Sequence, residues 1–174
     1  MNQIEICRGD EEESMNHIEI KETIFKGKQN IPWSDVEKYL RRYDGLEIEN
    51  KEYGDIIHIN AVFADEYVHS RYTRKLRGAL AKTKANLAQV IPEIVKCATN
   101  RRWVENKDDK HKENAIGGWY RYDIQFSMRV KDPQKECSSL NYYNGTVIVK
   151  INDTGMYLYD IINIKKEASK PTDH

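Results

Sequence analysis

The chain lacks the sequence features of a membrane protein and of a protein stabilised by disulfides or zinc. Its 174 residues contain no run that approaches the roughly 20 apolar residues of a membrane span. The cysteines Cys7, Cys97 and Cys137 lie far apart and form no Cys-x-x-Cys pair, which indicates reduced thiols. The N-terminus has no basic start followed by an apolar stretch, so we expect no signal peptide. We therefore predict a cytoplasmic protein without membrane contact, bound metal or cofactor.

The chain also carries no net charge, because 28 Lys and Arg residues balance 28 Asp and Glu residues. Apolar residues make up 39% of the sequence, which is enough for one core in a chain of this length. An acidic run, residues 10–13, lies in an N-terminal segment with little other pattern. We expect residues 1–24 to be an acidic segment that is disordered or loosely attached, and residues 25–174 to form a single domain.

The first half of this domain has mainly helical patterns. Residues 32–40 begin with proline and place their apolar residues on one side, which predicts a short helix. Short strands are predicted at 46–48 and 56–59. The longest periodic segment, 71–98, keeps its apolar residues within one arc of a helical wheel. Pro92 predicts a kink or a break there, so this segment forms one bent helix or two.

The second half has the patterns of strands. Residues 119–130 alternate between apolar and polar side chains, as expected for a strand with one buried face. Strands are also predicted at 141–151 and 156–164, joined by the turn sequence Asn-Asp-Thr-Gly. The polar segment 106–118 is expected to be an exposed loop. Helices followed by strands predict an α+β fold, with N-terminal helices packed on a C-terminal antiparallel sheet.

Positive charge is concentrated in one segment. Residues 71–84 hold six cations and no acid: Arg71, Arg74, Lys75, Arg77, Lys82 and Lys84. His69 lies just before this segment, and Ser70 is a suitable N-cap for the helix that follows. A cationic stripe beside a titratable imidazole favours a surface that binds phosphate and acts on a phosphodiester. The alternative interpretation is a solvated helix face without a ligand.

Several longer strings resemble a known domain, the C-terminal domain of phage MuF-type polyvalent proteins. These strings are 72–73, 81–86, 91–94, 118–123 and 158–167, and the resemblance spans about residues 33–171. The domain is similar to the barnase, EndoU, colicin and RelE-like (BECR) group of small ribonuclease folds. The resemblance implies a metal-independent ribonuclease of the toxin type, with N-terminal helices and a sheet of about four antiparallel strands. It supplies no catalytic residues.

Metal-free RNA cleavage uses the ribose 2′-OH as nucleophile and needs a base, an acid and cations near the phosphorus. Imidazole suits the acid and base roles because it titrates near neutrality. The candidate catalytic residues are therefore His69, Lys82, His111 and Tyr159. Each also has an ordinary structural explanation: a surface or capping histidine, a solvated lysine, a loop histidine and a sheet tyrosine.

The candidate substrate-binding residues are cations of the basic segment and of the strands. They are Arg71, Arg74, Lys75, Arg121 and Lys165. In an ideal strand Arg121 points away from its neighbour Tyr122, so these two side chains should not line one cleft.

Two functions follow from these patterns. The first is an endoribonuclease effector that acts on RNA, with tRNA as one candidate, and is neutralised by an acidic immunity or antitoxin protein. The second is a catalytically inactive RNA- or protein-binding module associated with phage head or mobile-element proteins. A third, an ADP-ribosyltransferase, is disfavoured because no Arg…Ser-Thr-Ser…Glu-x-Glu pattern is present.

Overall fold

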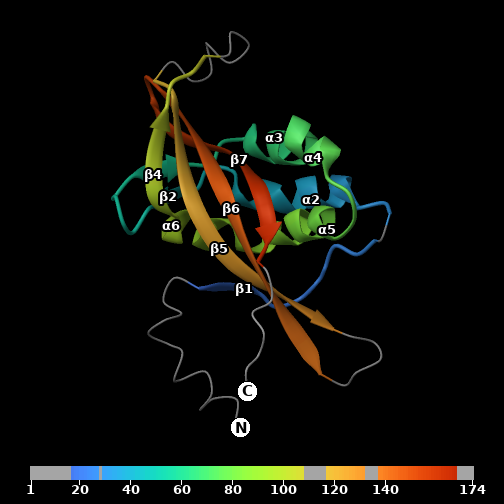
Figure 1. The fold of residues 1–174 in the computed structure, drawn as a ribbon. Helices are drawn as coiled ribbons and strands as arrows, with labels where there is room; N and C mark the ends of the chain where they lie inside the picture. The colour runs from blue at the N-terminus through green and yellow to red at the C-terminus, as the bar shows by residue number, and fades with distance from the viewer. Residues whose placement is uncertain (1–16, 28, 108–116, 132–136, 168–174) are drawn as a thin grey trace, which may run out of the picture.

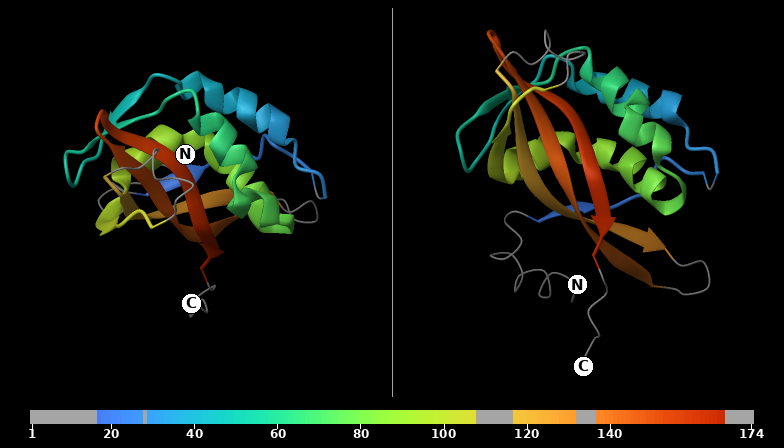
Figure 2. Two further views of the ribbon diagram at one scale, coloured as in Figure 1. Left: turned by 90° about the horizontal axis from the view of Figure 1, so that it is seen from above. Right: turned by 45° about the horizontal axis from the view of Figure 1, so that its top comes forward.

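The computed structural model describes residues 17–27, 29–107, 117–131 and 137–167 (Figure 1). These residues form an α+β fold in which helices cover one face of a curled sheet, and Figure 2 shows the helices gathered on that side. The helical elements are α2 (Trp33–Leu40), η2 (Arg41–Tyr43), α3 (Phe63–His69), α4 (Arg71–Lys75), α5 (Gly78–Leu87), η3 (Ala88–Val90) and α6 (Ile91–Cys97). The strands are β1 (Ile18–Ile20), β2 (Glu47–Glu49), β3 (Ile56–His58), β4 (Thr99–Val104), β5 (Trp119–Lys131), β6 (Ser138–Asn152) and β7 (Gly155–Lys166).

The sheet has seven strands within the described residues, so the expectation of about four strands is wrong in number. Its order is β1-β5-β6-β7-β3-β2, and β4 pairs with β5 beyond the end of β1. Strands β4 to β7 form a continuous antiparallel meander, in which the β6–β7 hairpin was predicted and strand β4 was not. The additional strands enlarge this meander: β1 joins β5 in parallel, and β3 joins β7 in parallel.

The buried face of the sheet follows the alternation seen in the sequence. Tyr122, Ile124, Phe126 and Met128 of β5 are all at most 4% exposed and belong to the hydrophobic core. They pack under α2, α5 and α6, whereas the intervening polar residues of β5 face the other side, which no described helix covers in Figure 1. The predicted inward and outward faces of this strand are confirmed.

The N-terminal boundary expected near residue 25 is too late for part of the segment 1–24. Residues 18–20 form β1, and their partners are residues 126–128 of β5. Ile20 is fully buried and Ile18 is 8% exposed, so this short strand contributes two side chains to the core. Residues 1–16, which include the acidic run, lie outside the described residues.

The helical segment expected over residues 71–98, as one bent helix or two, is divided into three α-helices, α4, α5 and α6. Leu76 and Arg77 adopt extended backbone conformations, and Gly78 has φ of +63°, a region that glycine enters without steric cost. Pro92 lies in the first turn of α6, where its missing N–H is tolerated, so it begins a helix and does not kink one. None of the described helices is both long and apolar enough to cross a membrane.

Candidate functional site

A groove of about 660 Å³ lies between residues 29–33 and the region formed by α3, α4 and the start of α5. Its polar lining includes the side chains of His69, Arg74 and Arg77, and Trp33 of α2 adds aromatic surface. The groove is positioned by the sharp chain reversals at the ends of α3 and α4. It therefore brings together the imidazole and two of the six cations that the sequence placed after residue 70.

His69 is the last residue of α3, and its side chain is 59% exposed. Its Nε2 atom lies 3.3 Å from Oε1 of Glu37 in α2 and 3.8 Å from Oδ1 of Asp65, one turn earlier in α3. Both carboxylates approach the same ring nitrogen and so orient the ring. The Nδ1 atom has no hydrogen-bond or ion-pair partner among the described residues.

The same three side chains are the best candidates for a metal site among the described residues. The ligand atoms of Glu37, Asp65 and His69 lie within 4.8 Å of one another. Imidazole and carboxylate are suitable ligands for several divalent metals. However, Glu37 also accepts a hydrogen bond from Arg41 at 3.1 Å, and ion pairs with His69 explain the short spacing. We therefore assign no metal to this cluster.

The two arginines of the groove lie at the junction of α4 and α5. Nη1 of Arg77 donates hydrogen bonds to the backbone oxygens of Arg74 and Leu76, both at 2.7 Å. These bonds hold the guanidinium group of Arg77 close to the turn. Arg74 is exposed in the last turn of α4. A planar guanidinium group is well suited to bind phosphate oxygens in pairs.

The other candidates from the basic segment do not line this groove. Arg71 and Lys75 are exposed on α4, and Lys82 is half-buried on α5. Lys84 is completely buried and so is not part of any phosphate-binding surface. The expected continuous stripe is thus dispersed, because the helix that would have carried it is broken at residues 76–78. His111 lies outside the described residues.

Tyr159, Arg121 and Lys165 belong to the strands and also lie outside the groove. The ring of Tyr159 packs edge-on against Trp119, with ring centroids 4.9 Å apart. Lys165 lines a second hollow of about 390 Å³ on the face of the sheet that the described helices leave uncovered. Arg121 lies on that face too, opposite to the buried side of Tyr122, as expected for neighbours in a strand. The predicted site residues are therefore divided between two surfaces.

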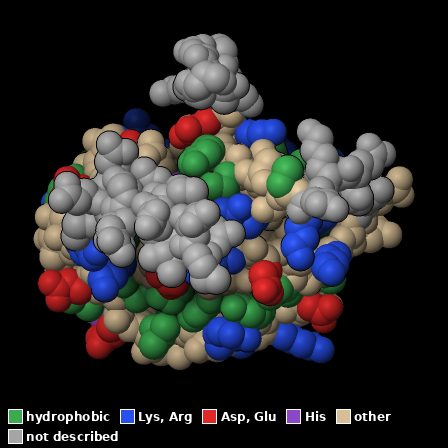
Figure 3. All heavy atoms as spheres, turned by 90° about the horizontal axis from the view of Figure 1, so that it is seen from below, with side chains coloured by type: hydrophobic (Ala, Val, Ile, Leu, Met, Phe, Trp, Pro, Cys, Tyr) green, Lys and Arg blue, Asp and Glu red, His purple; other side chains and the backbone are tan. Residues whose placement is uncertain are grey.

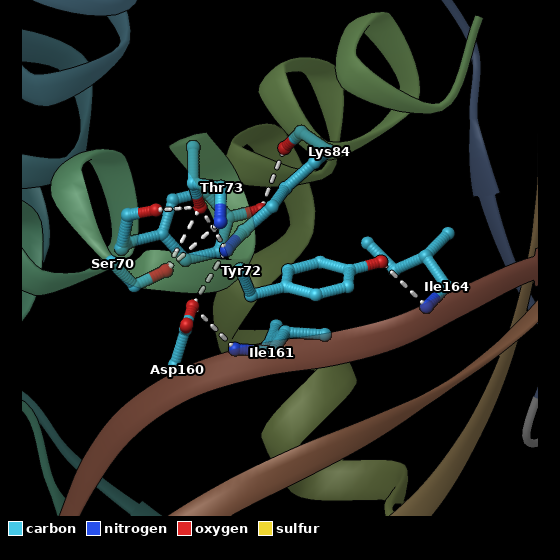
Figure 4. Close-up of polar contacts among 8 residues, drawn as sticks. Ser70, Tyr72, Thr73, Lys84, Asp160, Ile161 and Ile164 are labelled. Carbon is cyan, nitrogen blue, oxygen red and sulfur yellow. Dashed lines mark hydrogen bonds and ion pairs between the residues drawn. The ribbon is translucent and has the colours of Figure 1, made fainter. Parts of the chain in front are cut away.

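A buried ion pair between Lys84 and Asp160 lies between these surfaces, and sequence reasoning missed it (Figure 4). Nζ of Lys84 donates to Oδ1 of Asp160 at 2.7 Å and to Oγ1 of Thr73 at 2.5 Å. The two charged side chains are 0% and 3% exposed. Burial lowers the pKa of Lys84 and raises the pKa of Asp160, while their mutual attraction opposes both shifts.

This network also completes the edge of β7 where the short strand β3 ends. Oδ1 of Asp160 accepts the backbone N–H of Ile161 at 2.8 Å, and the hydroxyl oxygen of Tyr72 accepts the N–H of Ile164 at 2.9 Å (Figure 4). Ser70 caps α4 by accepting the N–H of Thr73, as predicted. Helix α4 is therefore fixed against β7, which determines where the groove lies.

Comparisons of this chain with family models, curated proteins and solved structures find no match.

Proposed function

We propose that the chain is a metal-independent, endoribonuclease-like domain of the toxin or effector type, of phage or mobile-element origin. It cleaves RNA by attack of the ribose 2′-OH on the adjacent phosphorus. The observation that carries this proposal is the groove in which an imidazole and two guanidinium groups converge: His69, Arg74 and Arg77. The resemblance to BECR-type ribonucleases agrees with this chemistry, and it is the reason for proposing RNA cleavage.

In this reaction His69 is the acid–base group of the groove. Glu37 and Asp65 approach its Nε2 atom and orient the ring. Arg74 and Arg77 bind the scissile phosphate and stabilise the charge that develops on its oxygens. The ring of Trp33 offers a surface on which an unpaired base can stack.

The test is cleavage of labelled single-stranded RNA and tRNA at protein excess, near neutral pH and in the presence of a chelator. We expect products that end in a 2′,3′-cyclic phosphate and loss of cleavage in the variant His69→Ala. The matched control is His58→Ala, because His58 is also a surface histidine beside a carboxylate, Glu47 at 3.5 Å, but does not line the groove. Intact RNA with the unchanged protein would end the proposal.

The second candidate function is a catalytically inactive module that binds RNA or protein. It is favoured by the position of Lys82 and Tyr159 outside the groove, which leaves His69 as the single candidate catalytic side chain among the described groove residues. Such a module would bind RNA with a steep salt dependence, would release no cyclic phosphate and would be unaffected by His69→Ala.

An acidic immunity or antitoxin protein is the partner that the ribonuclease proposal implies. Arg71, Arg74, Lys75 and Arg77 are exposed within one short stretch of α4 and the following turn, so one acidic surface can cover them together. Elsewhere the charge is mixed: seen from below, Lys and Arg side chains lie among Asp and Glu side chains (Figure 3). We therefore propose α4 and its C-terminal turn as the surface such a protein would cover.

A further inference from the structure

On the uncovered face of the sheet, Arg121 and Lys150 are two neighbouring cations that form no ion pair with any described acidic residue. Arg121 of β5 lies opposite Ile148 of β6, and Lys150 lies opposite Trp119, so both side chains point to the same face on adjacent strands. Diagonal neighbours of this kind have a spacing of about 7–8 Å, which long side chains can bridge. The two cationic groups are thus able to contact one small anion.

Both cations are partly withdrawn from water. Lys150 is 8% exposed, and Nε of Arg121 is buried without a hydrogen-bond partner in the part of the chain that the structure describes. The carboxylate that acts on Lys150 is Glu66 of α3, and the described residues include no ion pair or hydrogen bond between the two side chains. Burial lowers the pKa of Lys150. A partly desolvated cation is stabilised by a nearby counter-charge, so an anion bound between these two side chains would stabilise the arrangement.

The neighbouring charges do not supply that anion. Arg102 of β4 is paired with Arg121 in the sheet register and is bound to Asp123 at 3.0 Å, so this acid is already neutralised. The ammonium group of Lys150 lies 5.9 Å from the ring centroid of Tyr159, which adds only a weak cation–π contact. Arg121 and Lys150 therefore keep positive charge that these neighbours do not pair.

A polar hollow continues from these cations along the same face. Besides Lys165, its lining includes the amide side chains of Gln125, Asn144 and Asn163, and Gln125 lies directly opposite Asn144 in the sheet. Amides both donate and accept hydrogen bonds, which is the chemistry that reads the edges of unpaired bases. A phosphate position followed by an amide-lined hollow matches the repeating chemistry of a nucleic-acid strand.

We propose that the uncovered face of β5, β6 and β7 binds single-stranded RNA, with one phosphate group held by Arg121 and Lys150. This inference deepens the proposed function by naming a second contact surface for the substrate. The choice of RNA as the ligand rests on the proposed function. The two surfaces are neighbours in the molecule. Thr73 lines the groove and binds Lys84, whose other partner, Asp160, is adjacent to Tyr159 on β7.

The test uses the full chain and a short fluorescent 2′-O-methyl oligouridylate, which lacks the nucleophile for cleavage. Binding is measured by fluorescence anisotropy at several salt concentrations. We expect Lys150→Met and Arg121→Gln each to weaken binding about tenfold, the scale of one charge-assisted hydrogen bond, and to flatten the salt dependence. The matched control is Lys96→Met, an exposed lysine of α6 on the helical side of the molecule, which should bind like the unchanged protein.

A second measurement follows Lys150 directly, by NMR titration of carbon-13-labelled lysine side chains in the unchanged protein. Inorganic phosphate or the oligonucleotide should raise the pKa of Lys150, because either anion supplies the missing counter-charge. Unaltered binding in a folded Lys150→Met variant would overturn the proposal. A response to phosphate without any binding of the oligonucleotide would overturn the assignment to RNA.

The outcome is separable from that of the catalytic proposal. Binding that depends on Lys150 without any cleavage of natural RNA would contradict the ribonuclease proposal and leave this surface intact. Cleavage that depends on His69, together with binding that is insensitive to Lys150 and Arg121, would contradict this surface alone.

Discussion

The ion pair between Lys84 and Asp160 permits a sharp prediction about stability. Lys84→Met removes the ammonium group and keeps most of the side-chain volume. Asp160→Asn removes the charge and keeps an oxygen that can accept the N–H of Ile161. Each single variant leaves one buried charge without its partner, which should lower the free energy of unfolding by about 3–5 kcal/mol at neutral pH. The double variant carries neither charge and should be more stable than either single variant.

The two single variants should also respond to pH in opposite directions. In Asp160→Asn the remaining lysine is buried, and its folded-state pKa lies below the unfolded value of 10.5. Its contribution to stability is present above 10.5 and is lost as pH falls through the folded pKa, so this variant should recover at alkaline pH. In Lys84→Met the folded-state pKa of Asp160 lies above the unfolded value of 3.8. Its contribution is fully present below 3.8 and is lost as pH rises through the folded pKa, so this variant should recover at acidic pH.

The free energy of unfolding is measured by urea unfolding, followed by tryptophan fluorescence, at mildly acidic, neutral and alkaline pH. The four proteins are the unchanged protein, the two single variants and the double variant. Destabilisations that simply add in the double variant would show that the two charges do not interact, and so would refute the reasoning. Parallel pH profiles for the two single variants would refute the assignment of one uncompensated charge to each.

The remaining predictions concern the edge strand, the helix junction, the N-terminal strand and the groove. Tyr72→Phe leaves the N–H of β7 at residue 164 without its acceptor and should cost about 1 kcal/mol or more in urea unfolding. Gly78→Ala places a side chain at φ of +63°, where no atom clashes, so backbone strain of about 1–2 kcal/mol should be the whole effect in the same assay. Ile20→Ala should cost about 2–4 kcal/mol, and no loss would show that β1 is not part of the core. Replacing Arg74 with Gln should reduce RNA cleavage without changing the urea midpoint, because Arg74 is exposed.

Much of the sheet could be predicted from the sequence, because each of its long strands carries its own local signal. The alternation of residues 119–130 identified both faces of β5, and the Asn-Asp-Thr-Gly turn located the hairpin of β6 and β7. Strand β1 gave no such signal. It has only three residues, and its partners are more than a hundred positions away, so its pairing depends on the assembled fold.

The helical region was less predictable because apolar spacing alone does not show where a helix is interrupted. The periodicity of residues 71–98 continues across residues 76–78, where the backbone turns. Within it Lys84 was grouped with the other cations, since a charged residue normally faces water. Its burial is explained by Asp160, which lies 76 positions later. The sequence shows that a lysine is present, but it does not show whether a carboxylate far along the chain will form a buried ion pair with it.

The strings that carry the family resemblance coincide with this buried network more than with either exposed surface. Tyr72, Thr73, Lys84 and Asp160 all fall within those strings, and together they fix α4 and α5 to β7. His69, by contrast, lies outside them. Residues of the buried network determine the fold. They affect the proposed reaction only by positioning the exposed side chains. The proposed activity therefore depends on side chains at the groove and on the uncovered sheet face, where we expect variants to alter function without unfolding the protein.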